Sequence, residues 1–368
     1  MTVSEFKNAV LEEKIVDFLV NLNFDQEIDG SFYNSFYFYK KNKRKRIIHE
    51  PIQTLKKIQK RLLNLAYEFV ELRKNLVHRN SELILKNMKS GLIRGVTAYR
   101  PKSSVIRNAQ FHKNQELIIK LDINNFFGSV NKQLIYNFWR NLWIHQIRLI
   151  NQQETHFTTK EIQELTIKSV QLTTLNGTLP QGAPTSGYLA NCVLDEFDKI
   201  LLTYCSKRRL NYSRYSDDIT ISGNKMNSKE ISRVISFVSF HLKEFDFQLQ
   251  KNKTRILKNH NCQIVTGVVL NQKLSAPRKL KKQIRQQLYY LLKYGNSHLS
   301  LHHSNAKKYL NRLLGKINWV LQIEPKNQEF TNYKPTLIYL KDNVSSDGLN
   351  LSMLCNEYSI KSSRILVV

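Results

Sequence analysis

Acidic residues are scarce in this chain of 368 residues. It carries 29 Asp plus Glu against 57 Lys plus Arg, which gives a formal net charge of +28. A charge of this size repels itself unless the normal partner is a polyanion, and nucleic acid is the first candidate. Residues 247–323 contain fifteen basic residues and no acid, and residues 40–61 contain ten basic residues and one acid. A solvated face is the usual explanation of such runs, but solubility favours mixed signs.

Long apolar runs and paired cysteines are also missing. No run approaches the ~18 apolar residues of a membrane span, and no lipidation or secretory signal is found, so we expect a cytoplasmic protein that does not enter a membrane. The cysteines lie too far apart for a zinc site or a disulfide framework, and we expect reduced packing residues. They are Cys192, Cys205, Cys262 and Cys355.

Hydrophobic periodicity predicts a mixture of helices and strands. Helical spacing predicts helices over residues 4–22, 53–75, 229–246 and 277–292 and over most of 130–175. The aromatic and then basic segment 31–51 suits a β-ribbon with a Lys/Arg-rich turn. Further strands are predicted at 117–122, around 264–269, and on both sides of a turn within 211–222.

Three carboxylates carry the strongest chemical signal. Asp122 ends the apolar run LIIKLD, and Asp217 and Asp218 share the predicted turn of NYSRYSDDITIS. Adjacent carboxylates repel, so a cation is expected to neutralise them, and Mg²⁺ prefers hard oxygen ligands. Two such ions, about 3.5–4 Å apart, can activate a hydroxyl and stabilise leaving pyrophosphate. The alternative is that Asp217 and Asp218 are ordinary solvated turn residues.

Five blocks in order make the chain resemble the reverse transcriptase family over roughly residues 40–290. They are KLDINNFFGSV (120–130), LPQGAPTSG (179–187), YSDD (215–218), QKNKTRIL (250–257) and VTGVVLN (265–271). NAQFH (108–112) and Val265-Thr266-Gly267 are similar to signatures of bacterial retron reverse transcriptases. Locally, His112 has the alternative of an ordinary hydrogen-bonded histidine, and Gly267 that of a turn or bulge residue.

The resemblance implies an α+β, right-hand polymerase fold with fingers, an antiparallel palm sheet and a helical thumb. We expect an N-terminal helix and fingers over 1–115, and a palm over 116–272 with a helical fingers segment at about 130–175. A helical thumb is expected over 273–323. A C-terminal extension over 324–368 is a candidate RNA-recognition element.

The resemblance also assigns catalytic roles. Asp122, Asp217 and Asp218 would hold two Mg²⁺ ions, with the Ile123 carbonyl as a further ligand. Lys253 is similar to the lysine proposed to protonate leaving pyrophosphate. Its alternative is a solvated lysine.

Nucleotide-binding roles follow from the same match. Phe127 occupies the aromatic position that excludes a 2′-hydroxyl, and its alternative is a core Phe, since Phe126 is adjacent. Gln181 and Gly182 would form the floor of the nucleotide pocket. Arg44 and Arg46 of the ribbon would bind the triphosphate. The chain departs from the retron pattern at Gly187, where Pro is usual after Ser, which leaves the local turn geometry open.

Nucleic-acid contacts are expected from two further regions. Asn108 and His112 belong to the first retron signature. Lys279, Lys282 and Arg285 lie on a basic helix that would follow a nucleic-acid backbone, although a plain amphipathic helix is the alternative. Aromatic and histidine residues further on are candidates for stacking on unpaired RNA bases. They are Tyr294, His302, His303, Trp319 and Tyr333.

The expected function is that of a retron reverse transcriptase, an RNA-directed DNA polymerase. The resemblance implies a cognate structured non-coding RNA that is both template and primer, deoxynucleoside triphosphates as substrates, and a branched RNA–DNA product (msDNA). It also implies anti-phage defence with a separate effector protein. Two alternatives stay open: another bacterial reverse transcriptase of the intron-encoded or abortive-infection type, and a non-catalytic RNA-binding scaffold.

Overall fold

The computed structural model describes residues 29–39, 45–80, 95–150, 158–302, 305–345 and 350–361, which divide into two compact units. The N-terminal unit is formed by the described residues within Met1–Phe111 and Glu116–Lys258. The C-terminal unit is formed by those within His112–Gln115 and Asn259–Val368. The helix predicted over 4–22, Arg44 and His303 lie outside the described residues. The predicted domain boundaries stay predictions.

A four-stranded antiparallel sheet lies at the centre of the N-terminal unit, with the strand order β4-β5-β3-β6. Strand β3 (Leu117–Asp122) is buried along almost its whole length, as its continuous apolar run predicts. Its neighbours are β5 (Asp218–Gly223) and β6 (Arg255–Lys258), and β4 (Asn211–Tyr215) pairs with β5. The predicted strands at 117–122 and within 211–222 are therefore confirmed.

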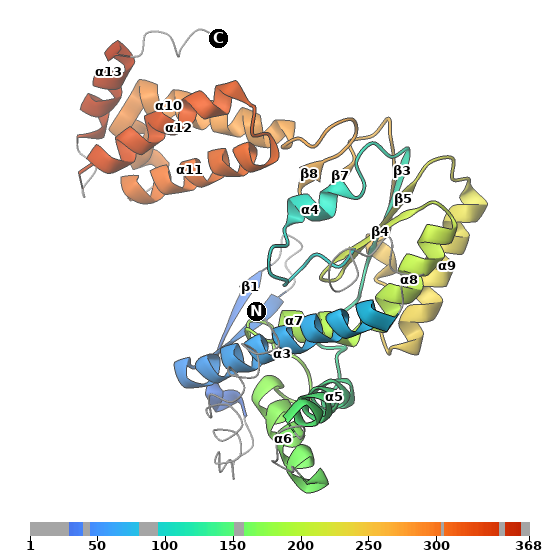
Figure 1. Ribbon diagram of the computed structural model, residues 1–368. Helices are drawn as coiled ribbons and strands as arrows, with labels where there is room; N and C mark the ends of the chain where they lie inside the picture. Colours follow the sequence, from blue (N-terminus) through green and yellow to red (C-terminus); the bar gives the residue numbers. More distant parts are fainter. Residues whose placement is uncertain are drawn as a thin grey trace. The chain divides into compact units, whose positions relative to one another are not determined.

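In the N-terminal unit, α8 (Asp195–Lys207) and α9 (Ser228–Glu244) lie beside this sheet (Figure 1). Three further helices, α3 (Gln53–Asn80), α5 (Lys132–Ile150) and α6 (Thr159–Thr173), form a separate group (Figure 1). Helix α8 contacts β4, and α9 packs against α8. Helices α5 and α6 pack together, and α3 contacts both. The helices predicted over 53–75, 130–175 and 229–246 are confirmed. The short helices α4 (Val105–Gln110) and α7 (Ser186–Val193), and α8, were not predicted.

Two buried tryptophans fix the α5–α6 pair. The indole N–H of Trp139 donates to Thr173 Oγ1 at 3.1 Å, and that of Trp143 donates to Ser169 Oγ at 3.0 Å. Both rings are fully buried, and a buried indole N–H is costly without an acceptor. These two hydrogen bonds therefore fix the position of α6 relative to α5, and with it the start of residues 175–182, which follow α6.

The predicted β-ribbon is confirmed. Strands β1 (Tyr33–Tyr39) and β2 (Lys45–Pro51) pair antiparallel, with Tyr33 opposite Pro51 and Tyr39 opposite Lys45. Residues 40–44, which join the strands, lie outside the described part of the chain.

The C-terminal unit combines a small hairpin with a helical bundle (Figure 1). The bundle contains α10 (Arg278–His302), α11 (Ala306–Ile323), α12 (Gln328–Asn343) and α13 (Leu351–Lys361). Helix α10 confirms the helix predicted over 277–292. It kinks at Gly295 (φ 46°), where a Cβ would lie 2.6 Å from the Cα of Ser352 on α13. Glycine thus permits the close approach of these two helices.

The single strand predicted around 264–269 is wrong. The structure forms two two-residue strands, β7 (Ile264–Val265) and β8 (Val268–Val269), which pair as a tight hairpin. Thr266 and Gly267 between them have φ values of 47° and 85°. This left-handed backbone favours glycine, so the turn alternative for Gly267 is confirmed. Among the described helices, none is long and apolar enough to cross a membrane.

Candidate active site

The sheet brings together the three carboxylates that were predicted to act together. Asp122 at the end of β3 is the register partner of Asp218 at the start of β5. The backbone N–H of Ile123 donates to the carbonyl of Asp217 at 2.9 Å. Asp217 and Asp218 are both partly buried and have Asp122 beside them, which speaks against the alternative of ordinary solvated turn residues.

This cluster concentrates negative charge in a partly buried place. Burial raises the pKa of the Asp218 carboxyl, an effect that Lys120 opposes and that the charges of Asp217 and Asp122 increase. Each additional positive charge near the cluster would stabilise its ionised form.

Lys253 provides a positive charge that pairs directly with Asp122. It ends the short 3₁₀ helix η3 (Lys251–Lys253), and its Nζ donates to both carboxylate oxygens of Asp122, at 2.7 and 2.8 Å. Lys253 is thus an ion-pair partner rather than a free solvated lysine. Within the described ranges, no group of three or more His, Cys, Asp or Glu side chains is placed to hold a metal ion.

The oxygen donors at the cluster nevertheless fit a divalent cation. Three aspartates lie at one end of the sheet, with their backbones held together by the β3–β5 register and the Ile123 N–H. The buried carbonyl of Ile123 accepts no hydrogen bond from the described residues, so its oxygen is left for another partner. Carboxylate and carbonyl oxygens are the ligands that Mg²⁺ prefers. Asp122, Asp217, Asp218 and Ile123 are therefore the residues that would hold such an ion.

A buried ion pair, which was not predicted, supports the aspartate turn. Arg214 in β4 is fully buried, and its guanidinium donates two hydrogen bonds to Asp198 of α8, at 2.8 and 2.5 Å. It also donates to Asn191 Oδ1 at 3.0 Å and to the carbonyl of Ser216 at 3.1 Å. Ser216 has a φ of 61°, so Arg214 holds the one residue of the turn with left-handed backbone.

The charge state of this pair follows from its contacts. Burial alone would lower the pKa of Arg214, but the adjacent Asp198 carboxylate outweighs it and raises that pKa. The hydroxyl of Tyr212 donates to the same carboxylate. A buried ion pair of this kind contributes little net stability, so its main effect here is to fix geometry. The sequence feature that could have indicated this ion pair is one arginine, Arg214, inside a strand whose central residues are buried.

Tyr99 packs against the same turn and accounts for the glycine at 187. Its hydroxyl lies 3.0 Å from Ser216 Oγ, and its ring makes an edge contact with Phe127 at 6.2 Å between centroids. A Cβ on Gly187 would lie 2.5 and 2.8 Å from the two Cδ atoms of Tyr99. Glycine at residue 187, where the retron pattern has Pro, therefore leaves the space that the ring of Tyr99 occupies.

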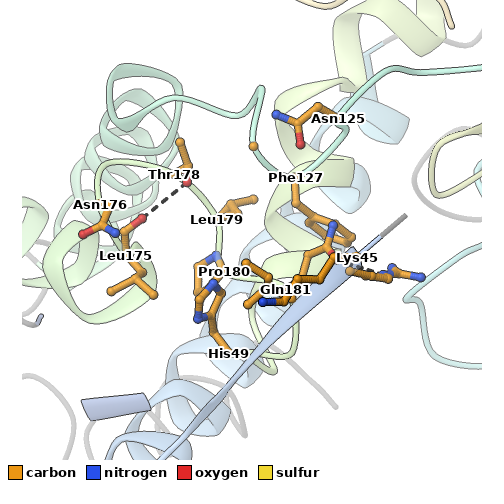
Figure 2. Close-up of a pocket in the computed structure, with 13 residues that line it drawn as sticks. Lys45, His49, Asn125, Phe127, Leu175, Asn176, Thr178, Leu179, Pro180 and Gln181 are labelled. Carbon is orange, nitrogen blue, oxygen red and sulfur yellow. Dashed lines mark hydrogen bonds between the residues drawn. The ribbon is translucent and has the colours of Figure 1, made fainter. Parts of the chain in front are cut away.

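A pocket of about 400 Å³ lies between the ribbon, the turn after β3 and residues 175–181 (Figure 2). The Gln181 carbonyl accepts from the His49 N–H at 2.7 Å, and its side chain accepts from Arg46 Nε at 2.9 Å. Gly182 has a φ of 117°, and a Cβ there would lie 2.9 Å from the His49 carbonyl oxygen. The predicted pocket residues Arg46, Gln181 and Gly182 therefore lie together.

Phe127 and Phe126 have different surroundings. Both are buried, but Phe127 lines the pocket, whereas Phe126 packs on Phe247 in the core. Figure 2 shows the Phe127 ring beside Gln181. Phe126 is thus the inward-facing ring of the two, and Phe127 is available to the pocket.

The structure does not expose two of the predicted nucleic-acid contacts. Asn108 and His112 are 1% and 0% exposed. Asn108 accepts a hydrogen bond from Thr97, and burial lowers the pKa of His112 to about 3, so the imidazole is neutral. A structural role fits both better than the predicted direct contact with nucleic acid.

The three predicted thumb contacts differ from one another. Lys279 and Lys282 are exposed on α10. Arg285 instead forms a two-bond ion pair with Glu329 of α12, at 2.5 and 2.7 Å. Its charge is therefore already neutralised within the bundle.

Comparison with known proteins relates the chain to one protein family. The profile of the family described as "Reverse transcriptase (RNA-dependent DNA polymerase)" matches residues 39–287. The retron Se72 reverse transcriptase of Salmonella heidelberg is 28% identical over 75% of this chain and 64% of that protein. The retron Mx65 reverse transcriptase of Myxococcus xanthus is 27% identical over 70% of this chain and 55% of that protein. A telomerase structure from Candida albicans with a TWJ fragment of telomeric RNA aligns at 11% identity, with a TM-score of 0.45, over 92% of this chain and 64% of that one.

Removing one partner of the buried ion pair should destabilise the protein strongly. We expect Arg214→Met to lower the free energy of unfolding by about 3–5 kcal/mol, because it leaves the buried Asp198 carboxylate uncompensated. The double variant Arg214→Met/Asp198→Leu should recover most of this loss. Denaturant unfolding measures both. A single variant that unfolds like the parent would contradict the assignment.

Adding a methyl group at residue 187 should disturb the ring of Tyr99. We expect Gly187→Ala to cost about 1–3 kcal/mol of unfolding free energy, as overpacking usually does. The matched control is Gly315→Ala on α11, where a Cβ would meet nothing within 4 Å. That change should stabilise by up to about 1 kcal/mol, the helix propensity difference. Equal effects at both positions in thermal melts would refute the packing argument.

Proposed function

Because this chain belongs to the reverse transcriptase family, we propose that it is an RNA-directed DNA polymerase of the retron type. Membership also confirms the predicted resemblance and the α+β, right-hand polymerase fold. The observation that carries the proposal is the register pairing of Asp122 with Asp218 beside Asp217. The chain spans 64% and 55% of the two retron relatives, so their activity is proposed for it.

The catalytic proposal assigns one role to each group of the cluster. Asp122, Asp217 and Asp218, with the Ile123 carbonyl, would hold two Mg²⁺ ions. When bound, these ions would supply the charge that activates the primer hydroxyl and neutralises the leaving pyrophosphate. Lys253 would balance the charge of Asp122, which its ion pair with Asp122 supports. Its second role, giving a proton to pyrophosphate, is proposed from the sequence resemblance alone. Arg214 would keep the Ser216 turn in place, so that Asp217 stays beside Asp122.

The nucleotide proposal rests on the pocket. Gln181, which lines the pocket, and Gly182 beside it would form its floor, and the glycine allows the close approach of the His49 backbone that closes this side. Arg46 lines the pocket and carries a fixed positive charge for phosphates, and Arg44 is proposed from the sequence alone. Phe127 would pack against the sugar and exclude a 2′-hydroxyl. Its position in the pocket wall supports this role.

The proposed partner is a structured non-coding RNA that serves as template and primer. The retron relatives support an RNA template, and the net charge of +28 suits it. The finer proposal is a branched RNA–DNA product (msDNA), made in the cytoplasm in an anti-phage setting with a separate effector protein. Sequencing nucleic acid that copurifies with the protein tests it. A branched species with a short DNA arm would support the retron type, and its absence would favour an intron-encoded or abortive-infection enzyme.

Loss of one metal ligand should abolish synthesis. We expect Asp217→Ala to reduce primer extension on an RNA template by about 10³-fold or more, since each metal–carboxylate set stabilises several kcal/mol of transition-state charge. RNA binding, measured without metal, should persist. Asp342→Ala on α12 is the control and should keep full activity. If Asp217→Ala extended the primer as well as the parent, Asp217 would not be a metal ligand, and the alternative of a non-catalytic RNA-binding scaffold would be favoured.

Shortening Phe127 should relax sugar selection. We expect Phe127→Ala to lower the preference for deoxynucleotides over ribonucleotides by about 10-fold or more, the range that one shaped apolar contact provides. Single-nucleotide incorporation assays measure the ratio of the two specificity constants. Leu175→Ala, which also shortens a pocket-lining side chain, should leave that ratio unchanged. An unchanged ratio for Phe127→Ala would make Phe127 a core residue only.

A further inference from the structure

Lys253 engages both oxygens of the Asp122 carboxylate. Its ammonium group donates to Oδ1 at 2.7 Å and to Oδ2 at 2.8 Å. The same carboxylate is one of the proposed ligands of the divalent cations. An ammonium group at this distance brings positive charge into the space beside the oxygens that a metal ion would use. A metal ion and the lysine therefore repel each other when both are bound to Asp122.

The other two aspartates of the cluster have no such partner. No ion pair between described residues includes Asp217 or Asp218, and Lys120 acts on the Asp218 carboxyl through its charge alone. In the described part of the chain, the acidic, histidine and cysteine side chains include no group of three placed to hold a metal ion. This arrangement is the one expected when a lysine holds Asp122 in place of a metal ion.

The backbone around Lys253 is tied to β3, whereas its side chain is free to move into solvent. The N–H of Gln250 donates to the Asp122 carbonyl at 2.8 Å, and the N–H of Lys253 donates to the Gln250 carbonyl at 2.9 Å. Leu249 forms an isolated bridge with Ile123. The Lys253 side chain is nevertheless 54% exposed, and a lysine stem is flexible. Rotation about its side-chain bonds can therefore move the charge into water while the backbone stays in place.

We propose that Lys253 holds the Asp122 carboxylate only while no divalent cation is bound, and that binding of the cation breaks this ion pair. The inference rests on the proposed function, in which Asp122 is a metal ligand. Without metal, the lysine reduces the repulsion among three neighbouring carboxylates. The same contact lowers the affinity for metal, because the ion pair has to break when the metal binds. Lys253 is thus a positioning residue that also sets the metal affinity of the site.

The test measures binding of Mn²⁺ to the metal-free protein by electron paramagnetic resonance, without RNA or nucleotide. We expect Lys253→Met to tighten Mn²⁺ binding by at least about tenfold, a value that allows for solvent screening at a half-exposed side chain. The matched control is Lys251→Met. Lys251 is exposed on the same 3₁₀ helix and forms no ion pair with a described acid.

The control removes the same charge from the same helix without touching Asp122. We expect Lys251→Met to change the Mn²⁺ affinity by less than about twofold, since exposed charges are well screened. Equal tightening by Lys253→Met and Lys251→Met would overturn the proposal. Unchanged or weaker binding by Lys253→Met would overturn it as well.

Two further variants separate charge from side-chain shape. Lys253→Arg keeps the positive charge and can also donate two hydrogen bonds to a carboxylate, so its Mn²⁺ affinity should stay within about threefold of the parent. Asp122→Asn removes the shared ligand, so adding Lys253→Met to it should no longer tighten Mn²⁺ binding. A gain of about tenfold in Lys253→Arg, or in the Asp122→Asn background, would contradict the competition for Asp122.

Thermal melts give a second reading of the same competition. Addition of Mn²⁺ should raise the Tm of Lys253→Met more than that of the parent, because tighter binding to the folded state stabilises it more. An equal rise would overturn the proposal. The proposed function fails in a different way: if Asp122→Asn binds Mn²⁺ as the parent does, Asp122 is not a metal ligand. If only Lys253→Met is without effect, the metal assignment stands and the displacement of Lys253 is refuted.

Discussion

The site depends on keeping three mutually repelling carboxylates together. The β3–β5 register places Asp122 opposite Asp218, and the Ile123 N–H fixes Asp217 beside them. Repulsion and burial both raise the cost of ionising this group, as the raised pKa of Asp218 indicates. Lys253 offsets part of that cost through both oxygens of Asp122. The same unfavourable charge makes the cluster receptive to divalent cations.

Side chains outside the cluster hold the turn that carries Asp217 in place. Arg214 is held by Asp198 and Asn191, and it binds the carbonyl of the strained residue Ser216. Tyr99 fills the space that Gly187 leaves and reaches Ser216 from another side. The turn is therefore fixed by helices α7 and α8 as well as by its own strands. Preorganisation of this kind lets a site act without rearranging its charges during reaction.

The basic residues of helix α10 differ in their surroundings, which the amino-acid composition does not show. Lys281 and Arg285 stabilise the bundle through Glu324 and Glu329. Lys279, Lys282 and Lys293 lie on another face of α10 and have no such partners among the described residues. This net positive helix thus has one side whose cations are paired within the bundle and another side whose lysines and tyrosines are exposed.

The sequence by itself determined the local features of this protein. The apolar run before Asp122, the polar turn at Asp217 and the helical periods all depend on neighbouring residues. The first two were predicted correctly, as were the helices over 53–75, 130–175, 229–246 and 277–292. Only the tertiary structure decided which distant residues meet. It paired Arg214 with Asp198, buried Asn108 and His112, matched Gly187 to Tyr99 and neutralised Arg285. The physical reason is that burial and ion pairing are set by contacts between segments far apart in the chain, which periodicity cannot specify.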